Sequence, residues 1–381
     1  MRILQTYKVY PPDVHGGISE VMARISQLRT MSHDVRILVA RDHGFARRYL
    51  HDGTPVQAVG SLGQLMSMPI APGFPFALKR ATKQCDVLAL HAPFPLNDFS
   101  LLFGIPEDVA VVLHWHSEIA GARGQLPFIE SMLRNTVARA DRVVVTDEAM
   151  IQASPFLSKV AEKCDVVPYG VDVEFWSTVG EAEAAEIASI KAQHPRTVIS
   201  IGRLVPYKGY PVLLEAMQQV DAELVLIGEG SQGEALKAQA KRLGLADRVH
   251  FKGYLSRTEM KLHLHAAQVF VLPSISEAEG FGIVQVEAMA SGLPVINTNL
   301  NTTVPLIARH EIEGLTVEVG NAQALAGAIN RLLGDSDLSA RLAANGRQRA
   351  QVTYSNAAFL NGMQDVYQRA CDARRSGRAR S

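Results

Sequence analysis

Short runs of Val, Ile and Leu alternate with longer amphipathic stretches along the whole 381-residue chain. Runs that are apolar on both faces fit parallel strands covered on both sides, with the amphipathic stretches as the covering helices. The pattern therefore predicts the doubly wound α/β class, in which ligands bind outside the carboxyl ends of the strands. The clearest runs are Val35–Val39, Val109–Leu113, Arg142–Thr146, Thr197–Ile201, Glu223–Ile227, Val269–Leu272 and Pro294–Ile296.

The strand–helix series begins twice, which together with the chain length predicts two domains. Met1–Thr6 and a glycine pair open the first series, and Thr197–Arg203, followed by Lys208-Gly209, opens the second. Two Rossmann-like halves joined by one hinge imply a cleft between them. The expected organisation is a first domain at 1–168, a linker at 169–178, a second domain at 179–353, an amphipathic helix at about 354–371 and a basic tail at 372–381.

Charge and cysteine usage exclude several classes of protein. Lys plus Arg equals Asp plus Glu, 38 each, so the chain has no overall positive charge that would attract nucleic acid. The widely spaced Cys85, Cys164 and Cys371 form neither a zinc motif nor a disulfide framework and fit a reducing cytosol. No apolar run approaches the roughly 20 residues of a membrane span, and the chain starts with a strand rather than a leader. We expect a cytoplasmic protein, at most peripheral on a membrane.

Glycines and cations follow three predicted strands in the second half. Arg203 and Lys208, flanked by glycines after a strand, can neutralise a pyrophosphate, although a solvated strand-to-helix loop explains this motif equally well. Gly228 and Gly253-Tyr254 end two further strands, where glycine-lined strand ends can form a slot for a flat base. Taken singly, such glycines are ordinary turn chemistry.

Two glutamates flank a Gly-Phe-Gly segment where a helix is expected to begin. The backbone N–H groups around Phe281, Gly282 and Ile283 form an anion site. Carboxylates buried nearby, those of Glu279 and Glu287, need hydrogen-bond donors, and sugar and ribose hydroxyls are natural ones. The alternative is that Glu279 only complements the helix dipole, which leaves the glycine-flanked Phe unexplained.

These motifs resemble the signature of the retaining glycosyltransferases of family 4, among them bacterial mannosyl- and rhamnosyltransferases of polysaccharide assembly. The resemblance rests on the paired glutamates, the upstream Arg and Lys, the pair Gly16-Gly17, the segment His114-Trp115-His116 and a Pro-Tyr-Gly-Val-Asp172 linker. It extends over nearly the whole chain and is looser in the first half.

The resemblance implies the GT-B fold, with the donor in the C-terminal domain, the acceptor in the N-terminal one, and a C-terminal helix that returns to the first domain. In the family, the carboxylate matching Glu279 contacts the donor sugar, that matching Glu287 holds the ribose, and the residue matching His116 faces the reacting carbon. The implied catalytic residues are His116, Arg203, Lys208 and Glu279; the donor site adds Gly17, Gly228, Gly253, Tyr254, Phe281, Gly282, Ile283 and Glu287; and the acceptor site comprises Gly16, His91, His114 and His116.

The mechanism is expected to need neither metal nor cofactor. Arg203 and Lys208, with the helix start near Gly282, are expected to stabilise the departing diphosphate in place of a metal ion. Asp335-Ser-Asp337 matches the Asp-x-Asp motif with which metal-dependent transferases bind a diphosphate through a metal ion. The flanking sequence instead indicates the end of one helix and the capped start of another. No carboxylate stands out as a nucleophile, which favours same-face attack with the diphosphate as base.

Two first-half segments, His91–Asp98 and His114–Glu118, look similar to relatives that add mannose or rhamnose to lipid-linked saccharides. We therefore expect a GDP-sugar donor and a lipid-linked acceptor, and no nucleic acid partner. Such an acceptor suggests contact with the inner face of the cytoplasmic membrane through basic clusters, although a solvated helix face explains them equally well. The clusters are Arg41/Arg47/Arg48 and Lys79/Arg80/Lys83, the second beside Phe74 and Phe76.

Other readings remain open. A sugar-nucleotide epimerase of the same architecture would act on the donor without an acceptor, and a degenerate subunit would only bind it. A glucan synthase or phosphorylase is disfavoured by the chain length and by the missing cofactor-lysine segment. His116 taken alone is an ordinary core histidine at a strand end.

Overall fold

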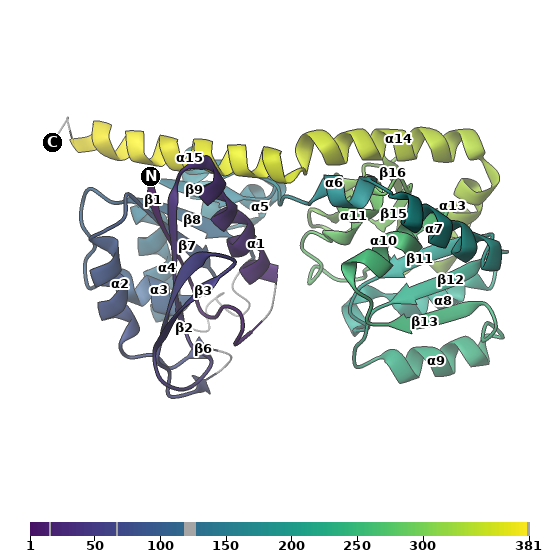
Figure 1. The fold of residues 1–381 in the computed structure, drawn as a ribbon, viewed down its shortest axis with the longest axis horizontal. Helices are drawn as coiled ribbons and strands as arrows, with labels where there is room; N and C mark the ends of the chain where they lie inside the picture. Colours follow the sequence, from purple (N-terminus) through teal and green to yellow (C-terminus); the bar gives the residue numbers. More distant parts are fainter. Residues whose placement is uncertain (15–16, 66–67, 118–126, 379–381) are drawn as a thin grey trace. The chain divides into compact units, whose positions relative to one another are not determined.

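The computed structural model describes residues 1–14, 17–65, 68–117 and 127–378. The chain forms two compact units, which we call unit 1 (Met1–Gly170 and Ala357–Ser381) and unit 2 (Val171–Asn356) (Figure 1). Residues 171–178, expected in a linker, belong to unit 2. They do so because Trp176 in α6 (Val173–Ser177) is fully buried, and its carbonyl accepts hydrogen bonds from Ser291 Oγ and His265 Nε2 at 3.3 and 2.8 Å.

Unit 1 is built on an eight-stranded sheet of order β10-β9-β8-β7-β1-β2-β4-β3, parallel except for the edge strand β3. Every residue of β7 and β8 is buried, as a sheet covered on both faces requires. Its strands are β1 (Arg2–Tyr7), β2 (Asp34–Ala40), β3 (Arg47–His51), β4 (Thr54–Val59), β7 (Val87–Ala92), β8 (Ala110–Trp115), β9 (Arg142–Val145) and β10 (Cys164–Val166), with a separate pair β5 (Gln64–Leu65) and β6 (Met68–Pro69).

One face of this sheet is covered by the end of the chain. Phe359, Met363, Val366 and Tyr367 of α15 pack with Ile3 and other residues of β1, β2, β7 and β8. The 3.6-residue spacing of these four side chains puts them on one helical stripe. The helical segments of unit 1 are α1 (Gly17–Ser26), η1 (Gln27–Met31), α2 (Phe74–Thr82), α3 (Pro95–Leu101), α4 (Pro127–Arg139), α5 (Glu148–Ala153), η2 (Leu157–Lys163) and α15 (Asn356–Arg378).

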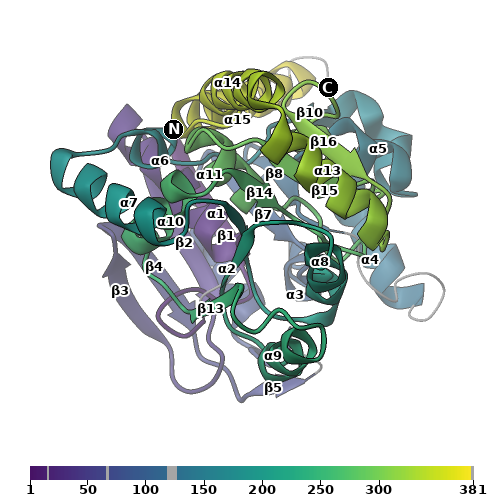
Figure 2. The ribbon, with the colours of Figure 1, turned by 90° about the vertical axis from the view of Figure 1, so that its right-hand side faces the viewer.

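Unit 2 has an all-parallel six-stranded sheet of order β13-β12-β11-β14-β15-β16. The predicted strands Thr197–Ile201 and Glu223–Ile227 are confirmed as β11 and β12. The sheet has helices on both faces (Figure 2). One face carries α8 (Tyr210–Met217), α9 (Gly233–Arg242) and α13 (Ala322–Gly334), and the other carries α10 (Arg257–Ala266) and α11 (Val284–Ala290). The remaining strands are β13 (Val249–Gly253), β14 (Val269–Val271), β15 (Val295–Thr298) and β16 (Gly314–Val317).

Helix caps in unit 2 follow the sequence signals. Ser256 and Glu259 form the predicted capping box of α10. The Asp335 carboxylate accepts a hydrogen bond from the Leu338 N–H at 2.9 Å, so it caps α14 where α13 ends. The helical segments are α7 (Glu181–Gln193), η3 (Pro206–Lys208), α8 (Tyr210–Met217), α9 (Gly233–Arg242), α10 (Arg257–Ala266), α11 (Val284–Ala290), α12 (Val304–Ile307), α13 (Ala322–Gly334) and α14 (Ser336–Thr353).

The strand order of each sheet reverses at one place. In unit 2 the chain moves from β11 to β12 on one side and later places β14 on the other side of β11. In unit 1, β2 and β7 flank β1 in the same way. In open α/β sheets, ligands bind at the carboxyl ends of the strands beside such a reversal.

No helix in the described ranges is both long enough and apolar enough to cross a bilayer.

Candidate functional site

A buried ion pair lies at the reversal point of unit 2. Lys208 Nζ, from the loop after β11, is 2.5 Å from Glu279 Oε2, from the loop after β14, and the side chains are only 9% and 10% exposed. Ser274 Oγ donates a second hydrogen bond to the same carboxylate oxygen at 3.0 Å. A carboxylate and an ammonium taken out of water need such mutual compensation.

The two loops are held together by their backbones. Ile275 N–H donates to the Tyr207 carbonyl at 2.8 Å. Gly209 adopts φ +70°, and a Cβ there would lie 2.0 Å from the Pro273 carbonyl oxygen. Glycine is thus required at this position by both conformation and space.

Arg203 lies beside the pair but is exposed to solvent. Its guanidinium donates to the Tyr207 hydroxyl at 3.1 Å, and the Lys208 ammonium lies 5.7 Å from the centre of the same ring. Within the described part of the chain Arg203 has no carboxylate partner. Two cations therefore flank one tyrosine at the end of β11, and one of them is available to an anion from solvent.

The glycines of the expected base slot are explained by backbone packing. Gly202 N–H donates to the Ile227 carbonyl at 2.9 Å, and Gly228 N–H to the Gly253 carbonyl at 2.8 Å, which continues the ladder past the strand ends. A Cβ on Gly228, at φ +134°, would lie 2.1 Å from the Gly202 carbonyl oxygen. Tyr254 follows and is 78% exposed. A base contact by these residues stays a prediction.

Hydrogen bonds from two buried side-chain amides hold the Gly-Phe-Gly segment in place. Gln285 Nε2 donates to the carbonyls of Phe281 and Val304, both at 3.3 Å, and Asn297 Nδ2 donates to Gln285 Oε1 at 3.0 Å. Gly282 adopts φ +70°, and Ile283 directly precedes α11. Glu287 is half-buried in α11, eight residues after Glu279. Sequence reasoning missed Gln285 and Asn297, whose signal is an amide within an otherwise buried apolar stretch.

Three histidines of unit 1 lie together, with the rings of His91 and His114 stacked and the ring of His116 edge to edge with that of His91. His91 and His114 are directly opposite in the β7–β8 register, with ring centroids 4.5 Å apart, and the His116 ring lies 5.1 Å from His91. His91 and His114 are 0% and 1% exposed, and His114 Nε2 is 3.0 Å from the Tyr367 hydroxyl of α15. Both expected acceptor ligands thus lie inside the unit, behind His116, and a direct acceptor contact by either stays untested.

A chain of hydrogen bonds determines the tautomer of His116. Gln5 Nε2 donates to the Met22 carbonyl at 3.0 Å, so Gln5 Oε1 faces His91 Nε2, 3.2 Å away, and must accept from it. His91 Nδ1 is then an acceptor, and its neighbour at 2.8 Å, His116 Nε2, carries the proton.

The remaining nitrogen of His116 is therefore an acceptor, and the Tyr169 hydroxyl donates to His116 Nδ1 at 2.7 Å. Both ring nitrogens of His116 are engaged. The face and carbon edge of the ring are therefore the parts left without a hydrogen-bond partner, and a substrate contact by His116 stays a prediction.

Burial keeps these rings neutral. Loss of hydration lowers the pKa of His116 to about 3. The pKa of His114 is also lowered to about 3, mainly by loss of hydration and to a smaller extent by the charge of His116. Burial also raises the pKa of Tyr169, so its hydroxyl stays a donor. Gly17 begins α1, and Gly16 lies outside the described residues.

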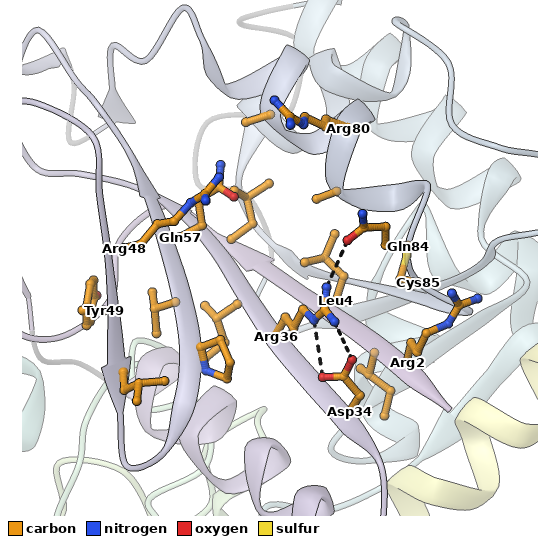
Figure 3. Close-up of a pocket in the computed structure, with 18 residues that line it drawn as sticks. Arg2, Leu4, Asp34, Arg36, Arg48, Tyr49, Gln57, Arg80, Gln84 and Cys85 are labelled. Atoms are coloured by element: carbon orange, nitrogen blue, oxygen red, sulfur yellow. Dashed lines mark hydrogen bonds and ion pairs between the residues drawn. The ribbon is translucent and has the colours of Figure 1, made fainter.

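A separate cavity of about 760 Å³ lies in unit 1 between α2 and the strands β1 to β4 (Figure 3). Arg48 from β3 and Arg80 from α2 line it, whereas Arg36 is paired with Asp34 at 2.8 Å. The cavity reaches the amino-terminal residues of β1 and β2, Arg2 and Asp34, so it is distinct from the strand ends that hold the histidines.

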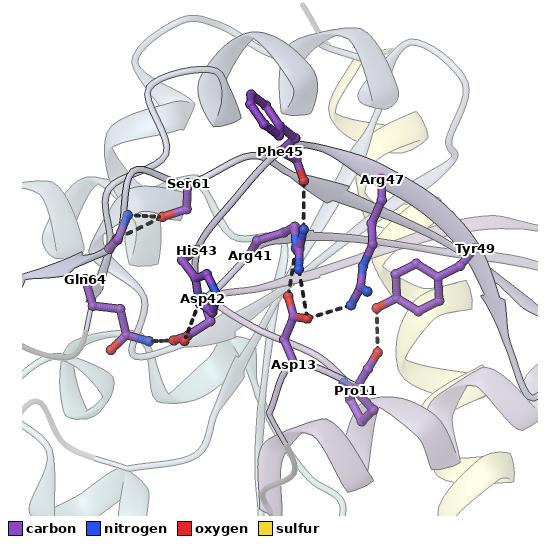
Figure 4. A network of polar contacts seen from close by, with 11 residues as sticks. Pro11, Asp13, Arg41, Asp42, His43, Phe45, Arg47, Tyr49, Ser61 and Gln64 are labelled. Atoms are coloured by element: carbon purple, nitrogen blue, oxygen red, sulfur yellow. Dashed lines mark hydrogen bonds and ion pairs between the residues drawn. The ribbon is translucent and has the colours of Figure 1, made fainter.

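Two of the three arginines of the first basic cluster, Arg41 and Arg47, share one carboxylate. Asp13 accepts from Arg41 at 3.0 Å and from Arg47 at 2.6 Å, beside the Tyr49 ring (Figure 4). Burial alone would raise the pKa of Asp13. The hydrogen bond and charge of Arg41, together with the charge of Arg47, outweigh burial and hold this pKa below its ordinary value. In the second cluster Phe74 is fully buried, contrary to its expected surface role, while Phe76 is 64% exposed.

Comparison with known proteins accounts for most of the chain. A family model described as "Glycosyl transferases group 1" matches residues 183–349, and one described as "Glycosyltransferase Family 4" matches residues 15–175. The O-antigen chain mannosyltransferase C of Escherichia coli is 24% identical over 376 residues, covering 96% of this chain and 98% of that protein. The D-rhamnosyltransferase WbpZ of Pseudomonas aeruginosa is 27% identical over 334 residues, covering 83% and 82%.

A GDP-mannose-dependent phosphatidylinositol monomannoside mannosyltransferase of Mycobacterium tuberculosis is 33% identical over 235 residues, covering 58% of this chain and 60% of that protein. Among solved structures, the HepE protein of Anabaena in complex with UDP superposes with a TM-score of 0.77 at 20% identity, covering 97% of this chain and all of that one. The two Rossmann-like units, the two family models and these relatives agree, and the chain belongs to the glycosyltransferases of the GT-B fold.

Proposed function

We propose that this glycosyltransferase moves mannose or rhamnose from a GDP-sugar to a lipid-linked saccharide of a bacterial polysaccharide or lipopolysaccharide, with retention and without a metal ion. The observation that carries the proposal is the buried Lys208–Glu279 pair at the reversal point of unit 2, with Arg203 beside it. The pair combines the two groups that a sugar diphosphate needs, a cation for the phosphate and a carboxylate for sugar hydroxyls.

Donor binding exchanges partners within this pair. The diphosphate replaces Glu279 as the anion beside Lys208, and sugar hydroxyls replace the ammonium as donors to Glu279. Neither buried charge is left alone at any stage, which matters because an uncompensated buried charge costs several kcal/mol. As the sugar–phosphate bond breaks, Lys208 and Arg203 face the charge that grows on the leaving diphosphate.

The relatives' names support the choice of donor and acceptor. The printed names of three relatives specify mannosyl or rhamnosyl transfer, one to an O-antigen chain, and one of them states dependence on GDP-mannose. We extend these properties to this chain as part of the proposal. An epimerase or a binding-only subunit has no specific observation in its favour.

A lipid-linked acceptor places unit 1 at the inner face of the cytoplasmic membrane. The centroid of the Phe103 ring, just after α3, lies 5.4 Å from those of Phe76 in α2 and Phe99 in α3. Lys79 and Arg80, also on α2, are exposed. Exposed aromatics next to cations fit an anionic lipid surface.

Lys208→Met is expected to lower kcat/KM by about tenfold to a hundredfold, because one charge-assisted hydrogen bond to the leaving group is worth roughly 1.5–3 kcal/mol. Steady-state kinetics with GDP-mannose measures this. Lys208→Met/Glu279→Gln removes both buried charges, and the thermal melting of the single and double variants separates loss of activity from loss of folding. The exposed Lys237, paired with Glu234 at 2.9 Å, provides the control Lys237→Met. An unchanged kcat/KM in Lys208→Met would contradict the role of the pair.

Calorimetry with GDP and UDP, each with and without EDTA, tests the donor and the metal requirement. We expect GDP to bind more tightly than UDP, with a Kd that EDTA leaves unchanged, because protein cations supply the countercharge. Tighter UDP binding would overturn the choice of base. Loss of GDP binding in EDTA would overturn metal independence.

Tyr169→Phe removes the donor to His116 Nδ1 and leaves a buried nitrogen unpaired. We expect kcat to fall about tenfold while the Kd for GDP stays the same, since roughly 1–3 kcal/mol holds the ring in one tautomer and orientation. Tyr49→Phe, which removes a hydroxyl bonded to the Pro11 carbonyl at 2.5 Å, is the matched control. Equal kcat in Tyr169→Phe and wild type would show that His116 needs no such positioning.

Charge reversal on α2 tests the membrane surface. Lys79→Glu/Arg80→Glu/Lys83→Glu is expected to abolish sedimentation with phosphatidylglycerol vesicles at low salt, because cations near an anionic surface each contribute about 1 kcal/mol. Phosphatidylcholine vesicles give the neutral control. The matched reversal on α9, Lys237→Glu/Lys241→Glu/Arg242→Glu, is expected to sediment like wild type. Failure of the wild-type protein to sediment would refute the membrane contact.

A further inference from the structure

Two histidines and a glutamate converge on one point at the opposite end of the unit 2 sheet. His194 Nδ1 and His250 Nε2 both contact Glu223 Oε2, the second at 2.6 Å, and one ligand atom from each of the three residues lies within 4.8 Å of the others. The side chains are partly buried, with 18%, 27% and 28% exposure for His194, His250 and Glu223.

The backbone places these three side chains together. Glu223 begins β12, and His250 on β13 pairs with Val225, two residues further along β12. Residues two apart on a strand share a face, so Glu223 and His250 lie on the same face of the sheet. His194 follows the last turn of α7, where its N–H donates to the Ile190 carbonyl at 3.0 Å and its carbonyl accepts from Thr197 Oγ1 at 2.9 Å.

We propose that His194, Glu223 and His250 form a binding site for one Zn²⁺ ion. Two imidazole nitrogens and one carboxylate oxygen are a donor set that zinc takes readily, with water in the fourth position. At the usual bond lengths of about 2.0–2.1 Å, tetrahedral ligands lie roughly 3.3 Å apart. The three atoms lie within 4.8 Å of one another, so side-chain rotations that open the two contacts to Glu223 Oε2 to this spacing admit the ion. Each neutral imidazole presents an unprotonated nitrogen by moving its proton to its other ring nitrogen.

The site is separate from the proposed transfer chemistry. Glu223 is the first residue of β12, whereas Gly228 follows the last one, so roughly 15 Å of strand separates the two ends. An ion at Glu223 therefore cannot clamp a diphosphate at Lys208. Its effect is to tie α7, β12 and β13 together, which stabilises unit 2.

Zinc titration of tag-free, EDTA-treated and dialysed protein tests the site. We expect one Zn²⁺ per chain by calorimetry and a Tm about 5 °C higher at 100 times the Kd, because an ion that binds only the folded state stabilises it by mass action. Co²⁺ substitution is expected to give visible absorption bands of low-coordinate cobalt. No stoichiometric binding to the wild-type protein would overturn the proposal.

Variants separate this site from chance binding. His250→Ala and Glu223→Gln are expected to lose the Zn²⁺-dependent rise in Tm and the Co²⁺ bands. His43→Ala, which removes a histidine that is 79% exposed and 3.2 Å from Asp42, is expected to keep both. A cooperative thermal transition checks that each variant is folded, and we expect unchanged GDP affinity in all three. Equal zinc binding in His250→Ala and wild type would refute the assignment, whatever the outcome for the donor site.

Discussion

The order of the strands in the unit 2 sheet is the constraint on which the candidate site depends. Because β12 and β14 lie on opposite sides of β11, residues far apart in sequence end neighbouring strands, and the loops after β11 and β14 contact each other at the carboxyl edge. Lys208 and Glu279 arrive from these two loops. Neither charge is tolerable alone at that depth, so the pair and the loop geometry require each other.

The same sheet uses its two ends differently. At the carboxyl end, Gly209 and Gly228 let backbone carbonyls approach where a Cβ would clash, and Gly202 leaves room for the side chain of Lys208. At the amino end, side chains of Glu223 and His250 themselves meet over one face. In a parallel sheet all strands begin at one edge and end at the opposite edge, so the two groups of residues stay apart.

Local signals predicted the fold well, and the partners of the site residues poorly. The apolar runs located β11 and β12 because a strand that is covered on both faces is a nearly continuous run of Val, Ile and Leu. The Lys208–Glu279 contact joins residues 71 positions apart in sequence, and no periodicity encodes such a distance. Likewise Phe74 and Phe76 are indistinguishable in sequence, and only the packing of α2 decides which one is buried.

The chain completes unit 1 last, although it begins there. Val366 and Tyr367 of α15 fill the core beneath β1 and β7, yet all of unit 2 is encoded before them. At about 5–20 residues per second, a ribosome delivers α15 some tens of seconds after the strands that it covers. During synthesis the apolar face of the nascent sheet therefore waits uncovered while unit 2 folds, which makes this interval the period in which the polypeptide most needs protection from aggregation.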